Sequence, residues 1–534
     1  MSGDSGLRTL LVGIDAACER VLDSLLADGE LPALASLFDE GASGPLESQV
    51  PPWTASAWPS LYTGMNPGKH GVFSFLAFDG YDWDVVNATD VRERTLWELC
   101  DRHGLRSVVV NVPVTHPPRP FDGALVPGYT APEEPTCHPD GILEAVRDAV
   151  GDYRVYPADD SREAYCEAVR TRGSAFRYLA DRFDPDFGFL EFQVTDTIFH
   201  KRPTDTETIR AIYRAVDRQI AATLDACKPE TVVVASDHGI GPYEGTEFRV
   251  NDFLREEGYV ETVRGGCGMP TWSRVREDAL KAGAEETDRE RRRGERAMAT
   301  LASVGLTSQR IGAALDRVGL ADAVASRVPD ALVSAGTEQV DFAASTASMR
   351  SRIELGVRIN LAGREPSGTV PASEYDTARN RLIEQLRSVR TPDGDRVFEA
   401  VGPREAFFDG PEVDRAVDIV TVPTNFDHFL TTTLHGSQFG DPTEPWNHKR
   451  DGVVVVSGDG VDAGASVGDA HLCDVAPTVL STLGIPADER MDGVALPCVD
   501  PPETRAYPRF TPERSAKTTD ERVTQRLANL GYIE

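Results

Sequence analysis

The sequence lacks the features that mark thiolate-metal, disulfide-rich and membrane-spanning proteins. Its eight cysteines include no Cys-x-x-Cys pair, so neither a thiolate zinc site nor a dense disulfide framework is indicated, and reduced, mostly buried thiols are expected. No apolar run is long enough to cross a bilayer, and the start, MSGDSGLRTLLVGID, has no basic region followed by a long apolar stretch. We therefore expect a soluble, cytoplasmic protein with no membrane span.

Basic residues are scarce relative to acidic ones. The chain has 55 Lys and Arg against 86 Asp and Glu, which gives a formal net charge of −31. This charge argues against a nucleic-acid polymer or an anionic membrane as the main partner. The acidic residues are spread along the whole chain, a pattern that suits a protein kept soluble in high salt, so we predict a halophilic, haloarchaeal source.

Stability is accordingly expected to increase with KCl concentration, because added cations screen the repulsion among the carboxylates. Thermal denaturation followed across a KCl series checks this. A protein that is most stable in dilute buffer would contradict the halophilic interpretation.

The chain alternates short apolar runs with amphipathic segments. Runs rich in valine, leucine and phenylalanine have the length of buried strands at 9–14, 106–112, 187–192 and 231–235. Helical spacing of apolar residues separates them, most clearly at 19–38, 161–183 and 206–227. Proline-rich residues 113–139 and the stretch 431–446 are expected to be loops. This alternation predicts an α/β protein with a parallel or mixed central sheet.

The length of 534 residues would allow three or four domains, but large α/β enzymes often place such a length in one core with insertions. Residues 251–339 change character, because a densely charged part is followed by the pattern of one or two amphipathic helices and no strand pattern is evident. We therefore predict one core domain formed by 1–250 and 340–534, with a mainly helical insertion at 251–339 that covers one side of the site.

A hydroxyl group is presented between turn-forming prolines and an aromatic run. Pro51 and Pro52 fix the approach of the backbone, and the residues after Thr54 have the pattern of a first helical turn. Unpaired N–H donors and the positive end of the helix dipole would favour an anionic substrate such as phosphate and would stabilise a threonine alkoxide. A helix cap is the commonest role of a threonine in this setting, so Thr54 becomes a candidate nucleophile only through the Asp and His residues elsewhere.

Candidate metal ligands stand at the ends of two predicted strands. Asp15 ends the first strand, where open α/β sheets bind their ligands, although capping of the next helix explains it about as well. Asp237 and His238 follow the strand at 231–235 and precede Gly239. Two adjacent ligand-type residues at the end of a strand are hard to explain by packing, so we predict a metal site there.

A second candidate group begins with Asp196 and His200, which are four residues apart. If the segment is helical, both side chains project from one face and can hold one ion, but Asp-x-x-x-His is more often a surface ion pair. His448, which precedes a predicted buried strand, would complete a set of three ligands. His435 and His471 are alternatives to His448.

In this order the motifs resemble the type I phosphodiesterase and nucleotide pyrophosphatase family, which belongs to the alkaline phosphatase superfamily. The resemblance rests on Gly13-Ile14-Asp15, VPPWTASAWPSLYTGMNPGKHG, Asp196 to His200, Ser236-Asp237-His238-Gly239, and His448 before a strand. It extends to the C-terminal part and covers the insertion least. It implies a three-layer αβα sandwich around a mostly parallel central sheet, with the helical insertion added to it.

The resemblance also implies two divalent metal ions. The implied ligands are Asp196, His200 and His448 for one ion, and Asp15, Thr54, Asp237 and His238 for the other. Mixed imidazole and carboxylate ligands suit Zn²⁺ best, with Mn²⁺ or Fe also possible. Such ions would lower the pKa of the hydroxyl and neutralise the phosphoryl oxygens, and Thr54 would form a phosphothreonine intermediate.

Departures from the family pattern leave one choice open. Ser56 stands two residues after Thr54, where many relatives have proline, so attack by Ser56 stays an alternative. A sulfatase is less consistent with the sequence, because the stretch lacks the Cys/Ser-x-Pro-x-Arg pattern. Nothing clearly supplies the serine and the additional basic contacts of a cofactor-independent phosphoglycerate mutase.

We therefore predict a two-metal hydrolase of phosphodiester or pyrophosphate bonds in a small phosphorylated substrate such as a nucleotide. A phosphate monoesterase or phosphotransferase of the same superfamily is the nearest alternative. Outside that class, an inactive scaffold could bind metal together with a nucleotide or a phospholipid headgroup.

Overall fold

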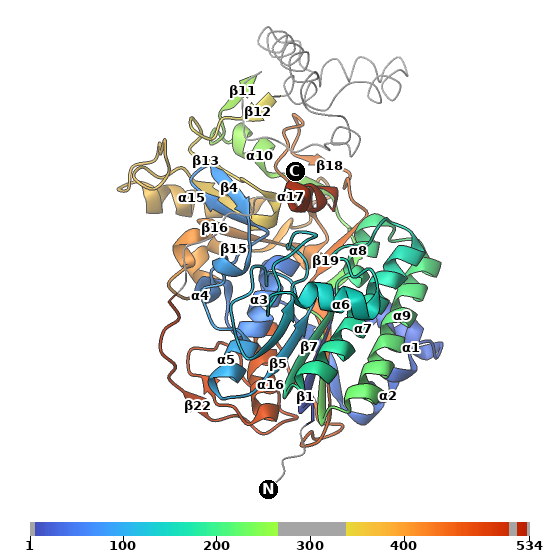
Figure 1. Ribbon diagram of the computed structural model, residues 1–534. Helices are drawn as coiled ribbons and strands as arrows, with labels where there is room; N and C mark the ends of the chain where they lie inside the picture. Colours follow the sequence, from blue (N-terminus) through green and yellow to red (C-terminus); the bar gives the residue numbers. More distant parts are fainter. Residues whose placement is uncertain (1–5, 265–337, 512–520, 531–534) are drawn as a thin grey trace, which may run out of the picture.

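A seven-stranded sheet forms the centre of the computed structural model, which describes residues 6–264, 338–511 and 521–530 (Figure 1). Its strand order is β2-β20-β8-β1-β7-β5-β6. In chain order these strands are β1 Thr9–Ile14, β2 Ala42–Glu47, β5 Ser107–Val110, β6 Gly123–Val126, β7 Phe187–Phe192, β8 Thr231–Ala235 and β20 Asp451–Gly458. Neighbouring strands in the part β8-β1-β7-β5-β6 are parallel to one another, whereas β20 is antiparallel to both of its neighbours, β8 and β2. The predicted α/β class with a mostly parallel sheet is confirmed.

The apolar strands form because both faces of the sheet are covered. Every residue of β1, β5, β7 and β8 is buried. Successive side chains enter opposite cores, so Leu11 packs in one apolar cluster while Leu10 and Val12 pack in the other.

Helices lie on both faces of this sheet (Figure 1). One face carries α1 Glu19–Ala27, α2 Pro32–Glu40, α6 Ile142–Val150, α7 Arg162–Phe183, α8 Val194–Lys201 and α9 Thr206–Cys227. The other face carries α3 Thr54–Thr63, α5 Leu96–Arg102 and α16 Val475–Leu483. The three-layer αβα sandwich predicted from the sequence is therefore confirmed.

A smaller four-stranded sheet extends the apolar core on the face of the central sheet that carries α3, α5 and α16. It has the order β13-β14-β16-β15, and α15 packs against β15. These elements are β13 Ala347–Ser348, β14 Gly356–Ile359, α15 Tyr375–Ser388, β15 Phe398–Pro403 and β16 Ile419–Pro423. The shorter elements are α4 Pro67–His70, β3 Leu76–Asp79, β4 Asp82–Val85, β9 Gly239–Pro242, β10 Glu247–Arg249, α10 Val250–Glu256, β17 Phe429–Thr431, β18 Phe439–Gly440, β19 Trp446–Lys449, β21 Ala487–Asp488, β22 Thr504–Arg505 and α17 Glu521–Asn529.

Several strands lie where the sequence pattern predicts loops or gives no signal. The stretch 113–139 contains β6, an edge strand of the central sheet. This strand was not predicted, because an apolar run of four residues between prolines is too short to be recognised in the sequence. The opposite edge strand, β2, contains glycine and proline and is only partly buried, so it lacks an apolar pattern. The stretch 431–446 contains β18 and reaches the start of β19.

The densely charged part of the predicted insertion, 276–299, and the one or two amphipathic helices predicted at 309–333 lie outside the described residues, as does Cys267. At the two ends of this segment, β11 Thr262–Arg264 pairs antiparallel with β12 Glu338–Val340, although no strand was expected there. The division into a core and an insertion at 251–339 stays a prediction. In the described ranges no disulfide forms between cysteines, and no helix has the length and hydropathy needed to cross a bilayer.

Candidate active site

The predicted ligands gather at one edge of the central sheet. The strands β1, β7 and β8 are parallel neighbours, so their carboxyl ends meet at that edge. Asp15 directly follows β1, while Asp237 and His238 follow β8. Asp196 and His200 lie on α8, which begins two residues after β7. Ligand-type residues that are distant in sequence are therefore neighbours in space.

Two further candidates arrive from other parts of the fold. Thr54 is the first residue of the ten-residue helix α3. His448 lies in β19. This strand pairs with β9, which begins directly after His238, and His448 lies opposite Ile240 in the pair. This pairing holds His448 beside the ends of the central strands.

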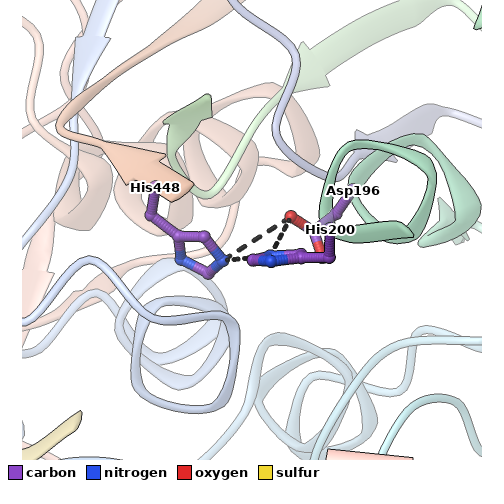
Figure 2. A group of neighbouring side chains, drawn as sticks. All are labelled: Asp196, His200 and His448. Carbon is purple, nitrogen blue, oxygen red and sulfur yellow. Dashed lines mark hydrogen bonds and ion pairs between the residues drawn. The ribbon is translucent and has the colours of Figure 1, made fainter. Parts of the chain in front are cut away.

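The first cluster consists of Asp196, His200 and His448, whose polar atoms point toward one another (Figure 2). Asp196 Oδ1 lies 3.2 Å from His200 Nε2 and 3.5 Å from His448 Nε2. The two Nε2 atoms are 3.1 Å apart. All three side chains are at most 2% exposed. The helical spacing proposed for Asp196 and His200 is confirmed, and the third member is His448.

The second cluster consists of Asp15, Asp237 and His238. His238 Nε2 lies 3.4 Å from Asp15 Oδ1 and 3.2 Å from Asp237 Oδ2. The hydroxyl oxygen of Thr54 lies 3.2 Å from the same nitrogen. The clusters adjoin, because the rings of His238 and His448 stack with their centroids 3.6 Å apart.

Backbone carbonyls fix how two of the histidines face the clusters. His448 Nδ1 donates to Pro52 O over 2.7 Å, and His238 Nδ1 donates to Gly239 O over 2.9 Å. A carbonyl can only accept, so in the neutral rings the proton is on Nδ1 and the Nε2 lone pair is directed into the cluster. Histidines that bind metals are commonly held in this way.

The glycine at position 13 lets the ring of Trp58 reach Asp15 at the end of β1. A side chain at Gly13 would meet the ring of Trp58 at 2.5 Å, so only glycine lets this ring approach the strand. Trp58 Nε1 then donates to Asp15 Oδ2 over 3.3 Å. Ala16 adopts a left-handed conformation with φ of 59°, and its N–H donates to Asp237 Oδ1 over 3.4 Å. Trp58 thus holds the Asp15 carboxylate, while the backbone N–H of Ala16 holds that of Asp237. Asp15 does not cap α1, whose N-cap is Cys18.

Buried carboxyl groups repel one another at this site. Burial, followed by the charges of Asp237 and Asp196, raises the pKa of Asp15 well above its usual range. Burial raises the pKa of Asp237 to about 6, although His238 opposes the shift. Burial also disfavours the charge of Asp196, but His200, His448 and His238 together outweigh it and lower this pKa. Bound cations would relieve the repulsion.

The donor geometry fits two divalent ions. Bonds of about 2.0–2.1 Å in a tetrahedral zinc site place neighbouring ligand atoms about 3.4 Å apart. The separations that involve a histidine Nε2 run from 3.1 to 3.5 Å. Asp15 Oδ1 and Asp237 Oδ2 are buried and form no hydrogen bond with any described group. Unpaired buried carboxylate oxygens are costly unless a cation compensates them.

The other candidates are engaged elsewhere. The hydroxyl of Ser56 donates to Pro51 O over 3.1 Å and accepts from Gln49 Nε2 over 2.6 Å. His435 is exposed, and its backbone N–H donates to Asp252 over 2.7 Å. His471 Nδ1 accepts from the N–H of Cys473. Trp53, rather than Thr54, holds the N-cap position of α3.

Glu191 is a buried acid at the site that the motif analysis missed. It lies opposite Gly13 across β7 and β1, and burial raises its pKa well above the usual range. Asn111 Nδ2 donates to Glu191 Oε2 over 2.6 Å. Asn111 itself adopts a left-handed conformation with φ of 68°. A glutamate inside the apolar run FGFLEF was the available signal.

Comparisons with known proteins agree on the fold. Phosphonoacetate hydrolase from Sinorhizobium meliloti 1021, in complex with phosphonoformate, has a TM-score of 0.53 at 16% identity over 90% of this chain and 95% of that chain. Wild type alkaline phosphatase PafA has a TM-score of 0.51 at 14% identity over 90% and 96%. The fold is therefore alkaline phosphatase-like. No match was found among the curated protein sequences.

A family model identifies the chain more specifically. The model for type I phosphodiesterase / nucleotide pyrophosphatase matches residues 9–346. This range contains Thr54 and all members of the two clusters except His448. Because the match covers more than half of the chain, the protein belongs to the type I phosphodiesterase/nucleotide pyrophosphatase family.

Proposed function

We propose that the protein hydrolyses phosphodiester or pyrophosphate bonds of a small phosphorylated molecule, with Thr54 as the nucleophile and two divalent ions, most suitably Zn²⁺, as cofactors. The observation that carries this proposal is the position of the Thr54 hydroxyl, 3.2 Å from His238 Nε2 and at the junction of two clusters of buried metal-ligand residues. Membership of the family supports it.

Each cluster would hold one ion. The proposed ligands are Asp196, His200 and His448 on one side, and Asp15, Thr54, Asp237 and His238 on the other. When bound, the ions would supply positive charge that lowers the pKa of the hydroxyl and neutralises the phosphoryl oxygens.

Thr54 would attack phosphorus with its hydroxyl oxygen. An O–P bond forms, the bond to the leaving oxygen breaks, and the product is a phosphothreonine ester; water then cleaves this ester and restores the hydroxyl. Because Thr54 begins α3, the positive end of the helix dipole lies beside the attacking oxygen and favours both the alkoxide and the phosphoryl group. Burial of the surrounding carboxyl groups and histidines keeps these electrostatic effects strong.

The purified protein is expected to carry near two divalent ions per chain, and a strong chelator should remove diesterase activity that added zinc restores. Metal analysis and turnover of bis-p-nitrophenyl phosphate and p-nitrophenyl phosphate in high salt check this. Faster turnover of the monoester would indicate a phosphatase. Two bound ions without turnover of either ester would favour a binding scaffold, and a protein with no tightly held metal would contradict the ligand assignment.

A further inference from the structure

A buried chain of hydrogen bonds leads from α4 to the turn before Thr54. His70 Nε2 and Ser60 Oγ are 2.8 Å apart, and the Ser60 hydroxyl donates to Gln49 Oε1. Gln49 Nε2 donates to Ser56 Oγ over 2.6 Å, and the Ser56 hydroxyl donates to Pro51 O over 3.1 Å. The four polar side chains are at most 4% exposed. We call these four residues the Gln49 chain.

The Gln49 chain has one direction. The N–H of Val72 donates to His70 Nδ1 over 3.2 Å, so in the neutral ring the proton is on Nε2, which donates to Ser60. Burial lowers the pKa of His70 to about 3, so the ring stays neutral at ordinary pH. Each later hydroxyl or amide group then accepts from the preceding member and donates to the next one. The chain ends on the backbone carbonyls of residues 51 and 53, which accept from the Ser56 hydroxyl, and Gln49 Nε2 also donates to Pro51 O over 3.2 Å.

The turn at the end of the Gln49 chain contacts both halves of the candidate site. Thr54 follows it directly. Pro52 O accepts the hydrogen bond from His448 Nδ1, and the ring of Trp53 lies 5.0 Å from that of His448. The turn therefore joins the candidate nucleophile of one cluster to a histidine of the other.

We propose that the Gln49 chain positions Thr54 and His448 relative to each other, with Gln49 and Ser56 as positioning residues. This inference rests on the proposed role of Thr54. Gln49 is the central member, because its amide oxygen accepts a hydrogen bond from Ser60 and its amide nitrogen donates one to Ser56. Misplacing a reacting group by about 1 Å can reduce a rate about 10²-fold, so loosening the turn affects turnover more than binding.

The test compares Gln49→Met, which keeps the side-chain length but removes all three hydrogen bonds of the Gln49 amide, to Ser60, Ser56 and Pro51 O, with Ser56→Ala. Each variant is expected to lower the kcat for bis-p-nitrophenyl phosphate about 10- to 100-fold while KM changes less than about threefold. Because both substitutions break the hydrogen bond between Gln49 and Ser56, the double variant should lose less than the product of the two single losses. Titration with a competing chelator should show that one of the two ions is released more readily. Ser74→Ala is the matched control. Ser74 is also a buried serine, but its hydroxyl forms its two hydrogen bonds with the backbone of Leu76 and not with any member of the Gln49 chain.

Unchanged kcat and unchanged metal retention in Gln49→Met and Ser56→Ala would overturn the inference. So would an effect confined to KM, or an equal loss in Ser74→Ala, which would indicate general destabilisation. If Gln49→Met does not fold, Ser56→Ala decides. A wild-type protein without diesterase activity would refute the proposed function instead, and metal release from the two variants would then still decide whether the Gln49 chain holds His448.

Discussion

Replacing Thr54 by alanine is expected to lower the kcat for bis-p-nitrophenyl phosphate by about 10³- to 10⁶-fold, the range found when an enzyme loses its nucleophile. The variant removes the oxygen that lies 3.2 Å from His238 Nε2 but leaves in place the three aspartate and histidine side chains of each cluster. It should therefore keep near two ions per chain. Steady-state kinetics together with metal analysis of the same preparation provides the measurement.

Two variants make this result specific to Thr54. Thr54→Ser keeps a hydroxyl and should retain much of the activity. Ser56→Ala should be far more active than Thr54→Ala, because the Ser56 hydroxyl is bonded to Pro51 O rather than directed at the clusters. Full loss in Ser56→Ala with turnover retained in Thr54→Ala would make Ser56 the nucleophile.

Replacing Asp196 by asparagine is expected to release one of the two ions and to reduce kcat/KM by about 10²- to 10⁴-fold, since a bound ion supplies several kcal/mol of transition-state stabilisation. Asp196 Oδ1 is the atom that faces both His200 and His448, so its charge holds the first cluster together. Metal content after dialysis against chelator, followed by kinetics with and without excess zinc, measures both effects.

Asp217→Asn is the matched control for Asp196→Asn. Asp217 is also a buried carboxylate, but it accepts hydrogen bonds from the N–H groups of Ala33 and Leu34 at the start of α2. This variant should keep both ions and its activity even if its stability falls. An Asp196→Asn protein that retains two tightly held ions would contradict the assignment of the first cluster.

The sequence predicts the main layers of the fold well, because apolar runs and helical spacing record burial directly. The predicted strand at 231–235 and the predicted helix at 206–227 coincide with β8 and α9. The edge strands β2 and β6 were not predicted, since an edge strand needs less apolar surface and both border on proline or glycine.

Only part of the candidate site could be predicted from the sequence. Asp15, Asp237 and His238 were visible because they end buried strands, and the spacing of Asp196 and His200 indicated one helical face. The family resemblance favoured His448 over His435, but the reason that His448 reaches the cluster is the pairing of β19 with β9, which no local pattern records.

Other features of the site depend on contacts that no spacing reveals. The Gln49 chain joins residues from a loop, a helix and a short helical turn, and Glu191 lies in an otherwise apolar strand. Ser56 was an alternative nucleophile from the sequence. In the structure its hydroxyl is bonded to Gln49 and Pro51, whereas the Thr54 hydroxyl lies 3.2 Å from His238 Nε2.

The stereochemical outcome at phosphorus tests the role of Thr54 most directly. Hydrolysis of a phosphorothioate diester that is chiral at phosphorus, in isotopically labelled water, distinguishes one displacement from two. Attack by Thr54 followed by attack of water inverts the phosphorus twice, so net retention of configuration is predicted. Net inversion would mean that water attacks the substrate directly, and it would contradict the assignment of Thr54 as the nucleophile.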